Sequence, residues 1–201
     1  TCACGENKVV TVVTGDQANK VDDLKDTELS IGDANINFGN AADSIGNQTS
    51  NDVTIGAGTL DEKEKQDVLD DLDDEKLEQI GNNPIYNFTV TDTENNLITD
   101  FEGHVVTITI PYELSEGEDV DSIAIWFIND KGEVESIPAT YNNGYVTFTT
   151  NHFSYYTVTR MTPAQRCEKH GHNYQTTVVP ATCVSGGYTL DLCTRCGDKV
   201  I

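Results

Sequence analysis

The fold of this chain is decided by residues 123–150, which read IAIWFINDKGEVESIPATYNNGYVTFTT. Three runs in this stretch are rich in Val, Ile, Thr and aromatic side chains, as strands are: residues 123–128, 133–137 and 145–150. Two sharp turns separate them, Asp-Lys-Gly at 130–132 and Asn-Asn-Gly at 142–144. Asn-Gly favours a hairpin because both turn residues need a positive φ. The stretch therefore predicts short strands joined by tight turns.

The same composition recurs on both sides of this stretch. Further strands are predicted at residues 8–13, 85–91, 104–110 and 155–159. Residues 15–58 are rich in Gly, Asn, Asp and Ser with short apolar alternations, which predicts short strands joined by loops. Many short strands at near-regular spacing indicate a sandwich, with Trp126 and Phe148 in its core. We expect a mainly β, β-sandwich-like fold with one or two helices.

One helix is predicted at residues 59–80. Thr59-Leu-Asp-Glu62 has the form of a capping box, and Gly81 is a suitable helix stop. A break is expected near Asp73-Asp74. The apolar stripe of the helix is formed by Leu69, Leu72, Leu77 and Ile80. Because such a stripe needs a sheet to cover, we expect residues 8–160 to form one acidic β-rich domain.

The charge of the chain limits its partners. Its 201 residues include 34 acidic and 12 basic residues, a formal net charge of −22. Nucleic acids and anionic membrane surfaces are repelled by such a field. No run approaches the ~18 apolar residues of a membrane span, so no membrane insertion is expected within this segment. Weak Ca²⁺ binding would suit the charge, but the acidic run at 70–75 lacks the ligand spacing of an EF-hand and reads as a solvated helix face.

The six cysteines lie at the two ends of the chain: Cys2, Cys4, Cys167, Cys183, Cys193 and Cys196. Cys193-Thr-Arg-Cys196-Gly197 is a knuckle whose two thiolates can face one ion. Cys167 with His170 or His172 offers a second half-site, which is the logic of a zinc ribbon. Residues 161–201 therefore predict a small module with a structural zinc ion, preceded by a linker at 160–166. Two disulfides that staple the module are the alternative.

The C-terminal pattern also carries a resemblance. Cys167-Glu-Lys-His-Gly-His-Asn-Tyr174, Ala181-Thr-Cys183, Gly187-Tyr188 and the knuckle resemble a short repeat of large surface proteins from Gram-positive gut bacteria. His172 matches the recurring His of that repeat, and His170 does not. The resemblance leaves five candidates for about four ligand places: Cys167, His172, Cys183, Cys193 and Cys196. Because residues 4–10 are similar to 196–201, we expect residues 1–7 to be the tail of a preceding Cys module.

The stretch from about residue 104 carries a second resemblance, most specific at residues 146–158, to a β-domain frequent in the same surface proteins. Its His152-Phe153-Ser154 is similar to the cleavage motif of self-cleaving nucleoporin and UPA-type domains. That similarity implies attack of Ser154 Oγ on the Phe153 carbonyl, with His152 as the base. In the alternative interpretation, Phe153 points into the core while His152 and Ser154 are ordinary outward polar residues.

Together these patterns predict a non-catalytic structural or adhesive module of a secreted or cell-surface bacterial protein. Its expected partners are other modules of the same protein, with a host glycan or host protein as the ligand in the adhesive case. The alternative function is an autoproteolytic domain that cleaves its own Phe153–Ser154 bond. One cut in its own chain is not turnover, so neither function makes the chain a conventional enzyme.

Overall fold

The computed structural model describes residues 8–12, 17–19, 21–49, 52–129 and 131–201. Cys2, Cys4 and the expected module tail at 1–7 lie outside the described residues. The chain divides into two compact units. The large unit is Thr1–Gly117 with Ile123–Thr159, and the small unit is Glu118–Ser122 with Arg160–Ile201.

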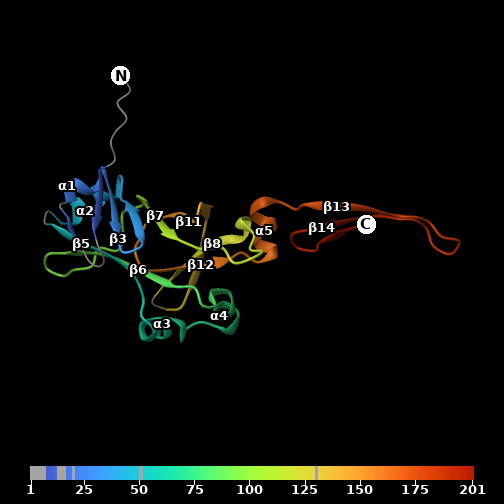
Figure 1. Ribbon diagram of the computed structural model, residues 1–201, viewed down its shortest axis with the longest axis horizontal. Coiled ribbons are helices and arrows are strands. Elements are labelled where there is room, and N and C mark those ends of the chain that lie inside the picture. The colour runs from blue at the N-terminus through green and yellow to red at the C-terminus, as the bar shows by residue number, and fades with distance from the viewer. Residues whose placement is uncertain (1–7, 13–16, 20, 50–51, 130) are drawn as a thin grey trace, which may run out of the picture. The chain divides into compact units, whose positions relative to one another are not determined.

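Two six-stranded sheets form the large unit (Figure 1). The first sheet has the order β1 (Lys8–Val12), β3 (Thr27–Ile31), β4 (Ala34–Asn37), β7 (Val106–Pro111), β11 (Tyr145–Thr150) and β10 (Ala139–Asn142). The second has the order β2 (Gln17–Asn19), β5 (Val53–Thr59), β6 (Ile85–Asp92), β12 (Tyr155–Arg160), β8 (Ile123–Ile128) and β9 (Val134–Ile137). The pair β1–β3 is parallel, and β3–β4, β4–β7 and β5–β6 are antiparallel.

The main apolar core takes side chains from both sheets, as in a sandwich. In the first sheet Ile108 lies opposite Ile36 on one side and Phe148 on the other, and all three are buried. Phe88 and Tyr156 of the second sheet belong to the same cluster. The buried and less buried positions alternate along β3, β4 and β7, as the period of two requires. The predicted β-sandwich-like class is confirmed.

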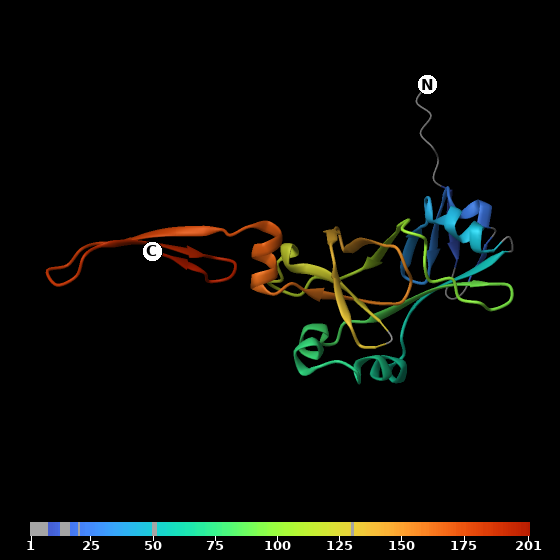
Figure 2. The ribbon, with the colours of Figure 1, turned by 180° about the vertical axis from the view of Figure 1, so that it is seen from behind.

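Two helices, α3 (Glu62–Leu69) and α4 (Asp74–Ile80), pack on the second sheet (Figure 2). Leu72 and Ile80 form a second apolar cluster with Trp126 and Ile128 of β8. Trp126 is thus buried as predicted, but under the helices and not in the main core. The break near Asp73 is confirmed, since Asp73 caps α4.

The predicted capping box at Thr59 is wrong by two residues. Thr59 is the last residue of β5, and the helix begins after Asp61. The Asp61 carboxylate accepts from the backbone N–H groups of Lys63 and Glu64, while the Glu64 side chain accepts from the Asp61 N–H. Asp61 is the better cap because Thr59 is committed to the β5–β6 ladder, opposite Tyr86.

Residues 15–58 also contain two helices that the loop-and-strand prediction missed, α1 (Val21–Leu24) and α2 (Ala41–Gln48). The residue before α2, Asn40, makes no side-chain capping hydrogen bond, so the usual start signal is absent. Ala41, Ala42 and Ile45 are nevertheless buried in the main core, and tertiary packing stabilises the helix.

None of the described helices is long and apolar enough to cross a membrane.

The predicted hairpin at residues 142–144 is confirmed. Asn142 of β10 lies opposite Tyr145 of β11, and both turn residues have positive φ, 49° at Asn143 and 86° at Gly144. In the other predicted turn Asp130 lies outside the described residues, while Gly132 has a φ of 69°. The strand expected from His104 begins only at Val106, since the backbone N–H of His104 donates to the Phe101 carbonyl in a turn.

The small unit consists of one helix, α5 (Pro163–His170), one 3₁₀ turn, η1 (Val120–Ser122), and a three-stranded antiparallel sheet. The strands of the sheet lie in the order β13 (Tyr174–Val179), β14 (Tyr188–Cys193) and β15 (Lys199–Val200). The linker predicted at 160–166 is wrong: Thr162 and Gln165 form a capping box, and Pro163 is the first helical residue. Ion pairs Arg160–Glu118 and Arg166–Asp119 connect this region with the η1 segment of the same unit.

Candidate metal centre

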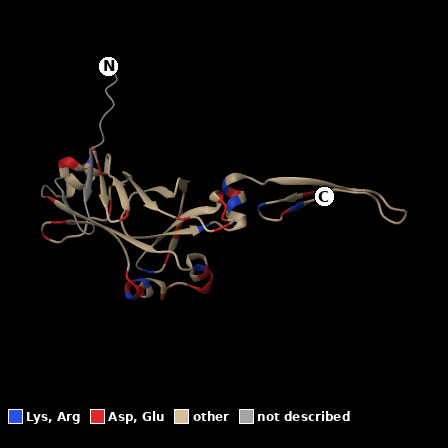
Figure 3. Cartoon of the chain, in the orientation of Figure 1, with Lys and Arg blue, Asp and Glu red and all other residues tan. Residues whose placement is uncertain are grey.

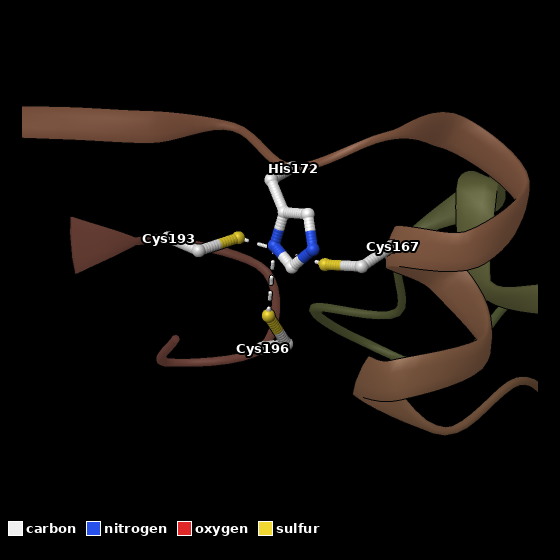
Figure 4. Close-up of side chains that lie close together, drawn as sticks. All are labelled: Cys167, His172, Cys193 and Cys196. Carbon is white, nitrogen blue, oxygen red and sulfur yellow. Dashed lines mark hydrogen bonds between the residues drawn. The ribbon is translucent and has the colours of Figure 1, made fainter. Parts of the chain in front are cut away.

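Four of the five predicted ligands meet in the small unit (Figure 4). Cys167 comes from α5, His172 from the segment after it, Cys193 from the end of β14, and Cys196 from the turn that follows. Their ligand atoms all lie within 4.8 Å of one another. The imidazole of His172 faces the sulfurs, and its Nδ1 is 3.4 Å from Cys196 Sγ.

The helix end places the first two ligands. The capping box at Thr162 fixes the start of α5, and Cys167 lies in its last turn with only 6% of its surface exposed. Gly171 then stops the helix with a φ of 73°, which a residue with a side chain adopts only with strain. His172 therefore leaves the helix axis immediately and can reach the knuckle.

The knuckle turn places the other two ligands. The Cys193 N–H donates to the Asp198 carbonyl at 2.8 Å, and the Gly197 N–H donates to the Cys193 carbonyl at 2.9 Å. Gly197 has a φ of 75°, so a glycine is needed after the second cysteine. The backbone folds around the place where both sulfurs point.

Arg195, for which the sequence predicts no role, connects the knuckle turn with the end of α5. Its Nη1 donates to the carbonyl of Gly171 at 2.8 Å and to that of His170 at 3.2 Å. These carbonyls end α5, where a cation also suits the helix dipole. The signal in the sequence is an arginine placed between the two knuckle cysteines.

The pKa values of the two buried thiols, Cys193 and Cys167, are shifted in opposite directions. Burial disfavours ionisation of the Cys193 thiol, but hydrogen bonds, first from the Cys196 backbone and also from His172, outweigh it and lower its pKa to about 5. Burial, together with the sulfurs of Cys196 and Cys193, raises the pKa of Cys167 to about 12. One sulfur thus ionises readily while its neighbour resists, as expected of thiolates that repel one another. A bound cation would remove that repulsion and allow all the sulfurs to ionise.

An aromatic side chain supports the histidine. The rings of His172 and Tyr174 stack with centroids 5.2 Å apart and planes 11° from parallel. The Tyr174 hydroxyl donates to the Asp198 carboxylate at 2.7 Å, and this bond, the largest cause, raises the pKa of Tyr174 to about 12. These contacts orient the imidazole beside the knuckle. Side chains that contact a metal ligand commonly orient it in this way.

The fifth candidate, Cys183, lies outside the cluster. It is exposed, in the turn between β13 and β14 where Thr182 bridges to Ser185. The four described cysteines all carry free thiols, and the sulfurs of Cys167 and Cys193 are 3.5 Å apart. A disulfide needs about 2.05 Å. Two disulfides would also require Cys183 to leave its turn.

The cluster has the composition of a closed structural site. Three sulfurs and one imidazole nitrogen would supply all four ligands of a structural zinc ion, whereas a catalytic zinc keeps one position for water. Soft thiolates together with imidazole suit zinc among the common divalent ions, and are poor ligands for Ca²⁺ or Mg²⁺. The four side chains therefore form a donor set that could bind a metal ion.

The His-Phe-Ser residues lie in the large unit, in the segment that crosses from β11 of the first sheet to β12 of the second. Phe153 is buried, with its ring centroid 5.0 Å from Phe101 and 5.7 Å from both Phe38 and Phe88. Ser154 Oγ donates to the Ile128 carbonyl at 3.2 Å. With Phe127, Asn87 and Thr89, these residues line a cavity of about 580 Å³.

His152 is half-buried between polar and aromatic groups. Its Nδ1 lies 2.8 Å from the Asn151 side-chain oxygen, and its ring meets Phe127 edge-on at 4.3 Å. Burial lowers the pKa of His152, although Glu135 and Asp100 oppose this effect. Within the described part of the chain, its Nε2 is buried and has no hydrogen-bond partner. The lowered pKa favours the neutral imidazole. Its Nε2, which makes no hydrogen bond in the described structure, belongs to a residue two positions before Ser154.

No protein-family model, curated protein or solved structure matches this chain.

Proposed function

We propose that this chain is a non-catalytic structural module of a bacterial cell-surface protein, in which a zinc ion stabilises the small unit. One observation carries the proposal: the ligand atoms of Cys167, His172, Cys193 and Cys196 lie within 4.8 Å of one another. The extracellular setting rests on the acidic composition and on the resemblance of both units to surface-protein repeats.

The small unit has almost no buried core, and this supports a stabilising role for the metal. Met161, Cys167 and Cys193 are its only buried residues among 160–201, and two of these three are ligands. A unit this small normally needs a metal or disulfides to fold. Zinc coordination would supply that stability, because metal binding and folding are one process when the site forms only in the folded chain.

The first test measures the metal in the intact chain under native conditions and again after denaturation. We expect one zinc ion per 22.0 kDa chain, lost on denaturation. Cys193→Ser should lose the ion, and Cys183→Ser is the matched control that should keep it. A mass lower by four hydrogens and no metal would replace the zinc centre with two disulfides.

A second candidate function is self-cleavage between Phe153 and Ser154. It is favoured by the neutral His152, whose buried Nε2 has no partner in the described structure. In this reaction Ser154 Oγ attacks the Phe153 carbonyl carbon, the C–N bond breaks, and the proton passes through His152 to the new amine. Water then hydrolyses the ester.

The fold suits such a cut without separation of the products. The new N-terminus would precede β12, an inner strand between β6 and β8 of the second sheet. The two pieces would therefore stay together until denatured. Two denatured masses that meet at Phe153/Ser154, and that disappear in Ser154→Ala, would support the reaction. A single 22.0 kDa mass after prolonged incubation of the wild-type chain would contradict it.

A further inference from the structure

The outer edge of β13 is an open strand edge in the small unit. Among the described strands, β13 has a neighbour only on the β14 side. It runs for six residues, Tyr-Gln-Thr-Thr-Val-Val, and pairs with β14 at every position without a bulge. Its other side therefore presents regular backbone donors and acceptors that another strand can pair with.

This edge lacks the features that normally prevent strand pairing. Such edges are usually short, charged, interrupted by proline or covered. The other edge of the same sheet, β15, has two residues and includes Lys199, and the edge strand β9 has four residues and includes Glu135. In β13 no residue is charged and none is proline (Figure 3).

Apolar side chains next to the edge remain exposed. Val178 is 71% exposed, and on the opposite face Tyr188 and Leu192 of β14 are 45% and 36% exposed. A sheet of three strands that is open on both faces has little apolar burial of its own. Another strand at β13 would cover part of these side chains on both faces.

The distribution of charge favours a second copy of this chain as the partner. The small unit holds six acidic residues and five Lys and Arg, whereas the rest of the chain holds 28 acidic and seven basic residues. Each small unit is thus nearly neutral, so two of them attract or repel one another only weakly through charge. A strongly charged partner finds no opposite charge along β13 itself.

We propose that β13 pairs antiparallel with β13 of a second copy, so that two small units form one continuous six-stranded sheet. A twofold axis normal to the sheet keeps each face on its own side and makes the contact self-complementary. With Thr176 opposite Thr176 on this axis, Tyr174 lies opposite Val178 of the other copy. Thr–Thr and aromatic–β-branched pairs are both favourable across strands.

The experiment measures the mass of the full zinc-bound chain by sedimentation from low micromolar to near-millimolar concentration. We expect the mass to rise from 22.0 kDa toward twice that value. Val178→Lys puts a charge on the edge and should raise the dissociation constant roughly tenfold or more, since each copy then brings a like charge. Val178→Thr keeps a β-branched edge and should associate like the wild type.

The matched control is Thr189→Lys, because Thr189 lies directly opposite Val178 on the inner strand β14 and on the same face. It adds the same charge without touching the edge, and should leave association unchanged. Zinc content, measured for each variant, separates a lost edge from a small unit that fails to fold. A monomer at every concentration overturns the proposal, as does association that survives Val178→Lys. Association that Thr189→Lys also abolishes would mean packing through the face and not the edge.

Discussion

The two units of this chain differ in what they bury. The large unit buries Ile, Val, Phe and Tyr side chains from both sheets in one cluster, with a second cluster under α3 and α4. The small unit leaves five of the six residues of β13 exposed, and two of its three buried residues among 160–201 are the candidate ligands Cys167 and Cys193. Under the proposed function, metal ligands would take the place that apolar area has in the large unit as the source of stability.

Removal of the metal should give the largest difference in stability between the two units. We expect a zinc chelator to unfold the small unit and to leave the large unit intact, because zinc binding is worth about 10–16 kcal/mol in small zinc-dependent folds. Amide resonances from 163–200 should collapse toward random-coil positions. Trp126, the only tryptophan, lies in the large unit and should keep its fluorescence. Unchanged resonances after verified zinc loss would contradict the proposed structural role.

A core truncation should produce the opposite pattern. Phe88 is 1% exposed and contacts Tyr86, Phe153 and Tyr156. Phe88→Ala should cost the large unit about 3–5 kcal/mol, followed by denaturation with Trp126 fluorescence. Zinc stoichiometry should not change. A simultaneous loss of zinc would mean that the units do not fold independently.

Local patterns in the sequence predicted most of the second half of the large unit. The strand at 123–128 and the turn at 142–144 follow from β-branched runs and Asn-Gly, which act over a few residues. Helix α2 could not be predicted in this way, because Asn40 gives no capping signal and only long-range packing buries Ile45. The position of Trp126 also depended on which face the helices cover.

At the metal site, too, local spacing predicts one part and long-range structure decides the rest. The spacing of Cys193 and Cys196 is local and predicts a shared ion. The choice among Cys167, His172 and Cys183 depends on α5, which begins after Thr162 where the sequence predicts a linker, and on the hairpin length that places Cys183 outside the cluster. Arg195 could not be assigned a role before its carbonyl partners at 170 and 171 were placed.

The two capping boxes offer a smaller and matched comparison. Asp61→Ala removes the cap of α3 in the large unit, and Thr162→Ala removes that of α5 in the small unit. Each should cost about 1 kcal/mol. In the large unit this appears as lower unfolding free energy. In the small unit it should appear as roughly fivefold weaker zinc affinity in a competition assay, because folding and binding are coupled. Equal zinc affinity in Thr162→Ala would mean that α5 forms without its cap.

The smallest expected effect is a pH dependence of the large unit's stability that comes from His152. Burial lowers the pKa of His152 in the folded chain, so the unfolded chain binds this proton more readily. Above the ordinary histidine value of about 6.5 both states are neutral and His152 makes no difference. As the pH falls below that value, protonation stabilises the unfolded state, and the stability of the large unit decreases until the folded-state pKa is passed.

His152→Gln tests this dependence because it removes the titrating group and keeps a polar side chain. Denaturation followed by Trp126 fluorescence should show a shallower loss of stability between about pH 7 and pH 5 in the variant than in the wild type. The comparison uses slopes, so a constant packing difference at Phe127 cancels. Carboxylates titrate in both proteins and cancel likewise. Parallel slopes would mean that the burial of Nε2 does not disfavour protonation. The neutral base on which self-cleavage depends would then lose its physical support.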